Sequence, residues 1–438
     1  MSSKTIAVGI DLGSYNSRVA TFDDHSNHPI CAHNSDGHRA TRVVLPADES
    51  GDGSTFSTRN TIPVTAENLD RYITEKLMPL AHDAAHTKDL SVIASIPNDE
   101  RISEEWLSAL KQSGRGVITE AAAVCLAYDL DERTASMASK RILVVDGGAS
   151  ALKVALLRGT TSGLWCLEST KKTDAVHGEA LVETLGQSVA QQFETKHRFP
   201  RGEVWQSKKA RAKLQRACEN GLTTMQINNT LTIRVESLYE GMDCQVTISE
   251  AKWDYLSGKL VRSAKDFLTK TATEHSQIDT VLLSGNMHAW LKPLVKSIFP
   301  GKLLSSGIDP SEAIAIGCTK QANWNLSHPT EAVATNIPTT IEATMSPIAI
   351  AIAQKDNVVI EQGTPLPALV NYEVSSSSSS SSPESAKEEQ SIEIWQVQPT
   401  EKHLATLSDL SSNSTVRVLL TESKKLRIAV GGESIVIG

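Results

Sequence analysis

Residues 6–22 place a carboxylate and a glycine at the spacing of a phosphate-binding turn. An apolar, strand-like run at 6–10 leads into Asp11 and Gly13, a short polar turn follows, and a second strand-like run returns. A turn of this kind points successive backbone N–H groups outward, where they can bind a phosphate. Gly13 permits close backbone approach, and Asp11 is placed to hold a metal-bound water. Taken alone, this hairpin makes phosphate binding a hypothesis, because many small hairpins look similar.

A second hairpin of the same kind lies at residues 141–158. Its apolar run ends at Asp146, the glycine pair Gly147 and Gly148 follows, and an apolar run that contains Lys153 returns. The acidic residue directly follows the first strand in both hairpins. Two such units in one chain suggest two similar lobes that face a nucleotide between them.

The elements around the hairpins indicate an α/β domain followed by a smaller β-domain. Up to about residue 325, strand-like runs alternate with helix-length segments, as in α/β layers. We expect strands at 90–96, 142–145 and 281–283, and helices at 66–86, 101–113, 178–197, 203–219 and 250–274. We expect a linker at 326–333 and a β-domain at 334–438. Eight consecutive serines at 375–382 predict a disordered loop at 375–390.

With these segments in place, the chain resembles the actin-like ATPase superfamily and, within it, the heat-shock 70 (DnaK-type) chaperones. Residues 9–17, GIDLGSYNS, are similar to the first phosphate loop of that family. Further matches follow in the family's order: 118–123 (ITEAAA), 176–179 (VHGE), 216–219 (RACE), 237–243 (SLYEGMD), 282–286 (LLSGN) and 309–317 (DPSEAIAIG). The resemblance implies a two-lobed nucleotide-binding domain at 1–325 and a truncated β-sandwich at 334–438. Because the chain ends at Gly438, we expect no helical lid.

The resemblance also implies which residues contact a nucleotide, with ATP as the expected cofactor and magnesium left open. These residues are Asp11, Gly13, Ser14, Tyr15, Asn16, Asp146, Gly147, Gly148, Lys153, Gly178, Glu179, Glu219, Gly285, Asn286 and His288. The alternative is that they only preserve the fold, since tight hairpins need glycines in any case.

Several matched positions depart from the family pattern. Lys153 stands where the family has an aspartate that holds a metal-bound water, and His288 stands where it has an arginine that stacks on adenine. The segment near 47–65 is shortened, and no residue matches the catalytic lysine that the family carries there. We therefore expect no catalytic residue, no metal ligand and negligible ATP hydrolysis.

Composition and other motifs narrow the classes of function. A net charge of −8 argues against direct nucleic-acid binding, although the basic helix at 208–216 leaves RNA contact as an alternative. Six scattered cysteines without a CxxC pair indicate a reducing compartment, and the absence of a leader or a long apolar run indicates a cytoplasmic protein. Two groups of residues could in principle bind a metal: the pair His82 and His86, and the group His25, His28, Cys31 and His33. We favour the alternatives, an exposed helix face for the first group and a strand with its turn for the second.

The altered ATPase-like domain and the lidless β-domain together resemble the Ssz-type members of the heat-shock 70 family. The resemblance implies a heterodimer with a zuotin-type J-domain protein, indirect contact with the ribosome, and stimulation of another heat-shock 70 chaperone on nascent chains. One rival is an ATP-dependent chaperone that binds unfolded peptides. A nucleotide-exchange-type member is a second rival, disfavoured because those carry long acidic insertions and helical extensions.

Overall fold

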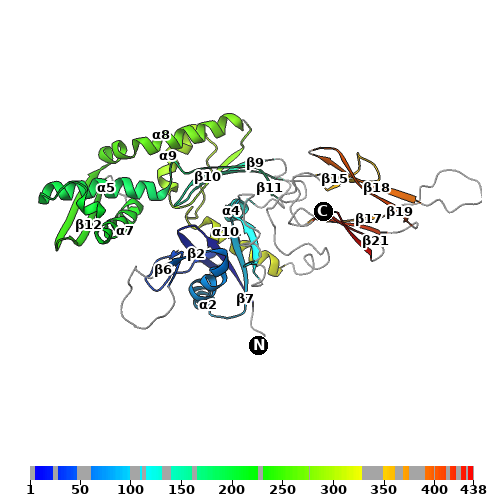
Figure 1. Cartoon of the computed structure of the whole chain (residues 1–438), viewed down its shortest axis with the longest axis horizontal. Helices are drawn as coiled ribbons and strands as arrows, with labels where there is room; N and C mark the ends of the chain where they lie inside the picture. Colours follow the sequence, from blue (N-terminus) through cyan, green and yellow to red (C-terminus); the bar gives the residue numbers. More distant parts are fainter. Residues whose placement is uncertain are drawn as a thin grey trace, which may run out of the picture. The chain divides into compact units, whose positions relative to one another are not determined.

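The computed structural model describes most of the chain as two compact units (Figure 1). The described residues are 5–22, 28–46, 61–98, 109–110, 115–130, 140–159, 165–224, 230–275, 277–327, 349–360, 368–373, 390–398, 400–410, 415–420, 426–430 and 433–437. The first unit comprises residues 1–141, 155–170 and 312–438, and the second comprises 142–154 and 171–311.

A six-stranded sheet forms the centre of the first unit. Its order is β3-β2-β1-β7-β8, with β4 also paired to β2. The strands are β1 (Ile6–Leu12), β2 (Asn16–Phe22), β3 (Pro29–Cys31), β4 (Thr41–Arg42), β7 (Leu90–Ile96) and β8 (Gly116–Thr119). A short ribbon of β5 (Val44–Pro46) and β6 (Thr61–Pro63) adjoins it in sequence. β1 runs antiparallel to β2 and parallel to β7, so the first hairpin lies within the sheet.

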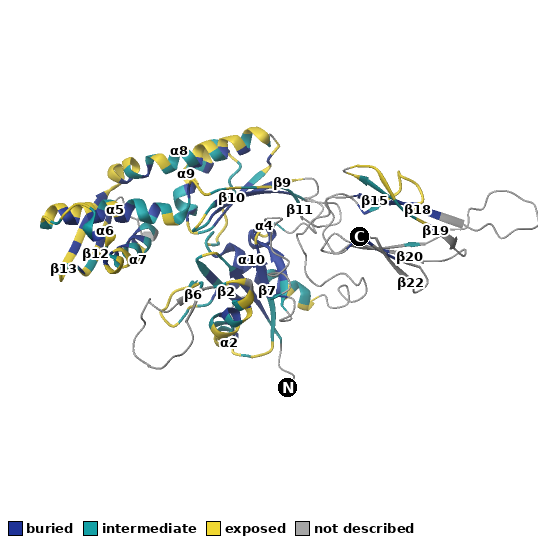
Figure 2. Ribbon diagram, viewed as in Figure 1, coloured by how far each residue is buried: buried dark blue, intermediate teal, exposed yellow. Residues whose placement is uncertain are grey.

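Alternation along β1 places helices on both faces of this sheet. Val8 and Ile10 share a core cluster with Leu69 and Tyr72 of the helical run at 66–85, which comprises η1 (Ala66–Asn68), α1 (Leu69–Tyr72), η2 (Ile73–Leu77) and α2 (Met78–Ala85). Gly9 faces the other way, where α10 (Ala313–Ser327) packs on β1 together with α4 (Glu120–Ala127). Both of these helices are mainly buried (Figure 2).

The second hairpin belongs to a four-stranded sheet of order β11-β10-β9-β14. Its strands are β9 (Arg141–Gly147), β10 (Leu152–Gly159), β11 (Trp165–Thr173) and β14 (Thr280–Ser284). The helices of the second unit are α5 (Gly178–His197), α6 (Glu203–Gln206), α7 (Lys208–Thr224), α8 (Glu250–Glu274) and α9 (His288–Ile298). They accompany a two-stranded ribbon of β12 (Thr230–Tyr239) and β13 (Met242–Ser249), on which α7 and α5 pack.

The described residues after α10 form strands only. One sheet has the order β16-β15-β18-β19 and the other has the order β17-β20-β21-β22. These strands are β15 (Ala349–Ile352), β16 (Val358–Ile360), β17 (Ala368–Glu373), β18 (Gln390–Gln398), β19 (Lys402–Leu410), β20 (Thr415–Leu420), β21 (Leu426–Val430) and β22 (Glu433–Ile437). Residues of both sheets, such as Ile352, Ile394, Val418 and Ile428, share one core cluster, as in a β-sandwich.

Most predicted elements are confirmed, with two corrections. The predicted helix at 203–219 is divided at Ser207 into α6 and α7. α2 ends at Ala85, and His86 adopts a left-handed backbone with φ 51°. Residues 47–60, 99–108, 111–114, 328–348 and 374–389 lie outside the described residues, so the shortened segment, most of one predicted helix, most of the linker and nearly all of the serine loop are not described.

Cysteines in the described core are buried, as predicted. They are Cys31, Cys125, Cys218, Cys244 and Cys318. Burial raises the pKa of Cys218 to about 12 and that of Cys244 to about 11. They therefore behave as small apolar side chains at neutral pH. Among the described residues, none of the helices is long and apolar enough to span a bilayer.

Candidate functional site

The first hairpin is a tight turn fixed by backbone geometry. β1 and β2 pair Asp11 with Arg18 and Leu12 with Ser17, which leaves residues 13–16 in the loop between the last two paired residues. A Cβ atom at Gly13 would lie 2.3 Å from the carbonyl oxygen of Asn16, so packing alone requires glycine here. The Leu12 N–H donates to Ser95 Oγ at 2.9 Å and ties the turn to β7.

Asp11 faces a cation that the sequence reading did not single out. Arg18 Nη1 lies 3.9 Å from Asp11 Oδ2, and the two side chains are only 11% and 8% exposed. Residues directly opposite each other in an antiparallel pair share one face of the sheet, which brings the two charges together. The signal for this pair was present in the sequence, because a four-residue loop between Leu12 and Ser17 sets residue 18 opposite residue 11.

Tyr15 is covered by a neighbouring strand. The Arg42 guanidinium carbon lies 3.7 Å from the Tyr15 ring centroid, and the Val43 N–H donates to the Tyr15 carbonyl at 3.0 Å. Asn16 pairs with Arg42 between β2 and β4, and Ser14 is exposed at the turn. The cation–π contact therefore holds one face of the Tyr15 ring.

The second hairpin repeats the pairing of an acid with a cation. Lys153 Nζ on β10 lies 3.9 Å from Asp146 Oδ2 at the end of β9, with side chains 31% and 13% exposed. The Gly148 N–H donates to the Ala151 carbonyl at 3.0 Å and closes the turn. In both hairpins, a cation on the returning strand thus neutralises the carboxylate.

The N-terminus of α5 supports the second turn from its carbonyl side. The N–H groups of Gly178 and Glu179 donate to the carbonyls of Gly148 and Ala149, each at 3.0 Å. His177 Nδ1 lies 2.9 Å from the Ala149 carbonyl and 3.3 Å from the Ala180 nitrogen, so its tautomer decides whether it bonds to the turn or caps the helix. The backbone N–H groups of Gly178 and Glu179 already donate to carbonyls of the turn, so a nucleotide could bind them only by replacing those hydrogen bonds.

The loop after β14 lies directly against the second hairpin. Ser284 is opposite Asp146 in the parallel register of β14 and β9. Gly285 has φ +83°, and a Cβ there would lie 2.4 Å from the Gly147 carbonyl oxygen and 2.7 Å from Asp146 Oδ1. The Met287 N–H donates to the same Gly147 carbonyl at 3.2 Å. The structure therefore brings the second hairpin and the matched segment 282–286 together around Asp146, and exposed Asn286 lies on this loop.

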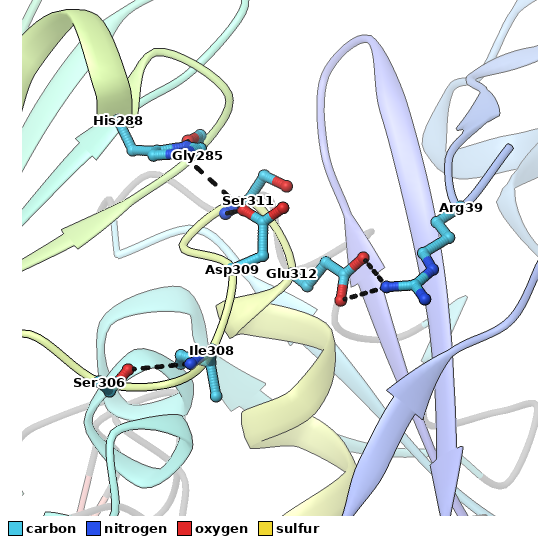
Figure 3. A network of polar contacts seen from close by, with 8 residues as sticks. All are labelled: Arg39, Gly285, His288, Ser306, Ile308, Asp309, Ser311 and Glu312. Atoms are coloured by element: carbon cyan, nitrogen blue, oxygen red, sulfur yellow. Dashed lines mark hydrogen bonds and ion pairs between the residues drawn. The ribbon is translucent and has the colours of Figure 1, made fainter. Parts of the chain in front are cut away.

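His288 begins α9 and is held by backbone and acid contacts. Its Nδ1 lies 3.0 Å from the Gly285 carbonyl, and its Nε2 lies 4.0 Å from Asp309 Oδ1 (Figure 3). The Asp309 carboxylate also accepts the Ser311 N–H at 2.9 Å, so it shapes the chain before α10. The imidazole is thus oriented by its neighbours at the position where the resemblance implies a base-stacking arginine.

Glu312 precedes α10 and anchors a loop of the first unit. Arg39 Nη1 donates to both Glu312 oxygens, at 3.0 and 3.4 Å (Figure 3). Arg39 Nε also donates to His33 Nε2 at 3.3 Å. Sequence reasoning missed this ion pair, since its partners are separated by most of the nucleotide-binding domain and only the fold brings them together.

Glu219 lies on α7, which packs on β12 and α5. A hollow with a volume of about 600 Å³ lies between α5, β13 and the start of α8 and is lined mainly by Gln, Thr, Ser and Lys side chains. Its lining contains none of the predicted site residues. We therefore treat the first hairpin in the first unit, and the second turn with the loop after β14 in the second unit, as two separate candidate phosphate-binding elements.

Neither alternative metal cluster is found as predicted among the described residues. His86 lies beyond the end of α2 in a left-handed conformation, so it does not share a helix face with His82 as predicted. Cys31 is on β3, as predicted, but His33 lies beyond that strand and accepts from Arg39 Nε, and His25 lies outside the described residues. Within the described part of the chain, no three His, Cys, Asp or Glu side chains are grouped for metal binding.

The residues of the hairpins suit phosphate better than magnesium. Mg²⁺ binds through carboxylates and retains several waters in octahedral geometry. Here the carboxylate of each hairpin has a fixed cation 3.9 Å away, and that cation would repel a divalent ion. A phosphate is attracted by the same cation. We therefore derive no step through magnesium.

Comparison with known proteins agrees with this architecture. The family model described as "Hsp70 protein" matches residues 113–404. A protein named "Heat shock 70 kDa protein 14" from Pongo abelii is 26% identical over 323 residues, which cover 70% of this chain and 62% of the relative. "Heat shock cognate 70 kDa protein 3" from Dictyostelium discoideum is 23% identical over 292 residues, covering 64% of this chain and 44% of the relative.

The chain thus spans about 62% of the length of the first of these relatives. The matched residues include the second hairpin, the loop after β14 and part of the β-sandwich. The fold is accordingly that of an Hsp70 nucleotide-binding domain with a small β-rich C-terminal part. On the extent of the family match, this protein is a member of the Hsp70 family.

Proposed function

We propose that this protein is a non-catalytic Hsp70-type co-chaperone of the Ssz kind, which binds ATP without turning it over. In this proposal it forms a heterodimer with a zuotin-type J-domain protein in the cytoplasm. The pair assists the folding of nascent chains at the ribosome by stimulating another Hsp70 chaperone.

The observation that carries the proposal is the ion pair between Lys153 and Asp146. Hydrolysis of ATP needs a water in line with the γ-phosphate and a metal that neutralises the developing charge. A lysine beside the strand-end carboxylate removes the negative site at which a metal-bound water would be held. Misplacing even one such positioning group costs about a hundredfold in rate.

The hairpin geometry also supports a binding role in the absence of turnover. The turn at 147–151 is held by the α5 N-terminus and by the loop after β14, so its backbone is fixed before a ligand arrives. A fixed turn with a nearby cation is suited to holding a phosphate. In this proposal the matched motifs serve nucleotide binding, and the altered positions, such as Lys153, account for the absence of ATP hydrolysis.

Steady-state hydrolysis by the purified full chain tests the proposal. We expect no phosphate release above background with ATP and magnesium, with or without an added J-domain protein. Turnover that rises with the J-domain protein and disappears in Asp11→Asn would overturn the proposal in favour of the ATP-dependent chaperone. Affinity purification from cytosol followed by mass spectrometry should recover a J-domain protein in stoichiometric amount.

A further inference from the structure

The polar hollow of about 600 Å³ in the second unit contains none of the residues considered for phosphate binding. It lies between α5, β13 and the start of α8, and all of its described lining falls within residues 171–311. Glutamine, threonine and serine side chains make up most of the wall. Because these side chains both donate and accept hydrogen bonds, the hollow suits a ligand that has polar groups along its length.

One wall of the hollow is the edge of a strand. Gln245, Val246 and Thr247 are consecutive residues of β13, and all three line the hollow. Successive side chains of a strand point to opposite faces, so a space that touches three residues in a row lies along the edge of the strand. Among the described strands, β13 pairs only with β12. Its other edge therefore has backbone N–H and C=O groups with which a further strand can pair.

The side chains of the hollow carry positive charge, although the whole chain has a net charge of −8. Lys196 on α5 and Lys252 on α8 both line the hollow, and both are exposed. No acidic side chain belongs to its described lining. Two lysines from different helices beside one strand edge are complementary to a ligand with carboxylates.

Tyr255 adds an exposed aromatic ring beside Lys252. It lies about one turn further along α8, and the Lys252 ammonium nitrogen lies 5.5 Å from its ring centroid. With 80% of its surface exposed, Tyr255 is the most exposed large apolar side chain in the described part of the chain. Tyrosine is enriched among the residues that contribute most to binding at protein interfaces. Its position next to the hollow therefore favours a protein ligand.

We propose that the hollow binds an extended, acidic segment of a partner protein, which pairs with the outer edge of β13 as a third strand of the β12–β13 ribbon. Backbone hydrogen bonds to β13 hold the segment, its carboxylates face Lys196 and Lys252, and an apolar side chain covers Tyr255. The inference is independent of the proposed function, because it uses no residue of the two candidate phosphate-binding elements.

Fluorescence anisotropy with the full chain and a short labelled peptide of alternating glutamate and valine tests the proposal. We expect saturable binding that weakens as the salt concentration is raised. Lys196→Glu and Lys252→Glu should each weaken binding by about tenfold or more, because charge reversal places like charges together. Lys265→Glu is the matched control: Lys265 is exposed on α8 but does not line the hollow, so this variant should bind normally.

Two further probes separate strand pairing from charge attraction alone. Alternate residues of a strand direct their N–H groups to opposite sides, so two peptides that are N-methylated at odd or at even positions should differ, one losing binding and the other retaining it. Hydrogen exchange resolved by peptide should show added protection in β13, residues 242–249, when the unmethylated peptide is bound. Oligouridylate, which is negatively charged but lacks a peptide backbone, should bind at least about tenfold more weakly.

Absence of saturable binding up to about 1 mM peptide would overturn the inference. Equal binding of the two N-methylated peptides, unchanged exchange in β13, or unchanged affinity in both lysine variants would overturn it as well. Oligouridylate that binds as tightly as the peptide and depends on the same lysines would replace it with a nucleic-acid surface. None of these results bears on ATP turnover or on the J-domain partner, so this inference and the proposed function can fail separately.

Discussion

Two glycines, Gly285 after β14 and Gly37 between β3 and β4, show how backbone conformation and packing each can require glycine. Gly285 and Gly37 both have a positive φ, +83° and +76°. A Cβ atom built on Gly285 would lie 2.4 Å from the Gly147 carbonyl oxygen. A Cβ atom built on Gly37 would meet nothing within 4 Å. The contrast makes Gly285 a position where shape and backbone conformation both require glycine.

Replacement of these two glycines by alanine should therefore give unequal losses of stability. Gly37→Ala should lower the free energy of unfolding by about 1 kcal/mol, because alanine is strained in the left-handed conformation. Gly285→Ala should lower it by about 3 kcal/mol or more, because a steric clash adds to that strain. Urea unfolding midpoints followed by tryptophan fluorescence measure both. Equal shifts for the two variants would mean that the loop after β14 relaxes freely and does not hold Asp146.

The limits of sequence reasoning are clearest for individual side chains. Asp11 and Asp146 were expected directly after their strands, and the structure has each of them as the last residue but one of β1 and β9. The error is small, because apolar runs ending in Asp and Gly are a local pattern. The partner of Asp11 was missed because Arg18 acts through strand register, which depends on the turn length. Arg39 and Glu312 could not be paired from sequence, since 272 residues separate them (positions 40–311) and only the tertiary fold joins them.

Secondary-structure elements were predicted best where their ends have local signals. α8 was predicted at its observed bounds, and the Ser249 hydroxyl caps it by accepting the Lys252 N–H at 3.3 Å. α5 was also predicted at its bounds, and Arg198 ends it in a left-handed conformation. The α6–α7 break at Ser207 was missed, because no glycine or proline marks that position.

Contact between α10 and α4 is the closest helix packing described in the first unit. A Cβ at Gly317 would lie 1.8 Å from the Ala123 carbonyl oxygen, so the two helices approach backbone to backbone. Gly9 on β1 allows the same helix to approach the sheet, with its absent Cβ 2.3 Å from the Ala315 carbonyl oxygen. α10 thus depends on two glycines to reach both the sheet and α4.

Alanine at Gly317 should destabilise the first unit, while alanine at Gly258 should stabilise the second. Gly317→Ala forces α10 away from α4, at a cost of about 3 kcal/mol. Gly258 lies within α8, and the nearest atom to its absent Cβ is the end of the Arg262 side chain at 4.0 Å, so Gly258→Ala gains about 1 kcal/mol of helix propensity. Hydrogen exchange resolved by peptide assigns each change to its unit. A neutral Gly317→Ala would show that the two helices are not closely packed in solution.

At the scale of the whole molecule, the β-sandwich is the part whose role the ATPase-like residues do not explain. Its two four-stranded sheets share an apolar core, and each sheet ends in edge strands: β16 and β19 in one, β17 and β22 in the other. Edge strands carry backbone groups that an extended segment of another chain can pair with. Such pairing needs neither ATP turnover nor closure of a groove, which is consistent with a constitutive partner.

Deletion of residues 334–438 should therefore abolish co-purification of the J-domain partner, while deletion of 375–382 alone should not. The sandwich supplies the strand edges, and a stable interface there should bury well over about 1,200 Å² in total. A run of serines offers little surface to such an interface and costs ordering entropy. Tandem affinity purification with quantitative mass spectrometry compares both deletions with the full chain. Calorimetry with ATP is the matched control, since the truncated chain keeps both hairpins and should bind nucleotide normally. If the truncated chain still retains its partner, the contact lies on the nucleotide-binding domain and the role given to the sandwich is wrong.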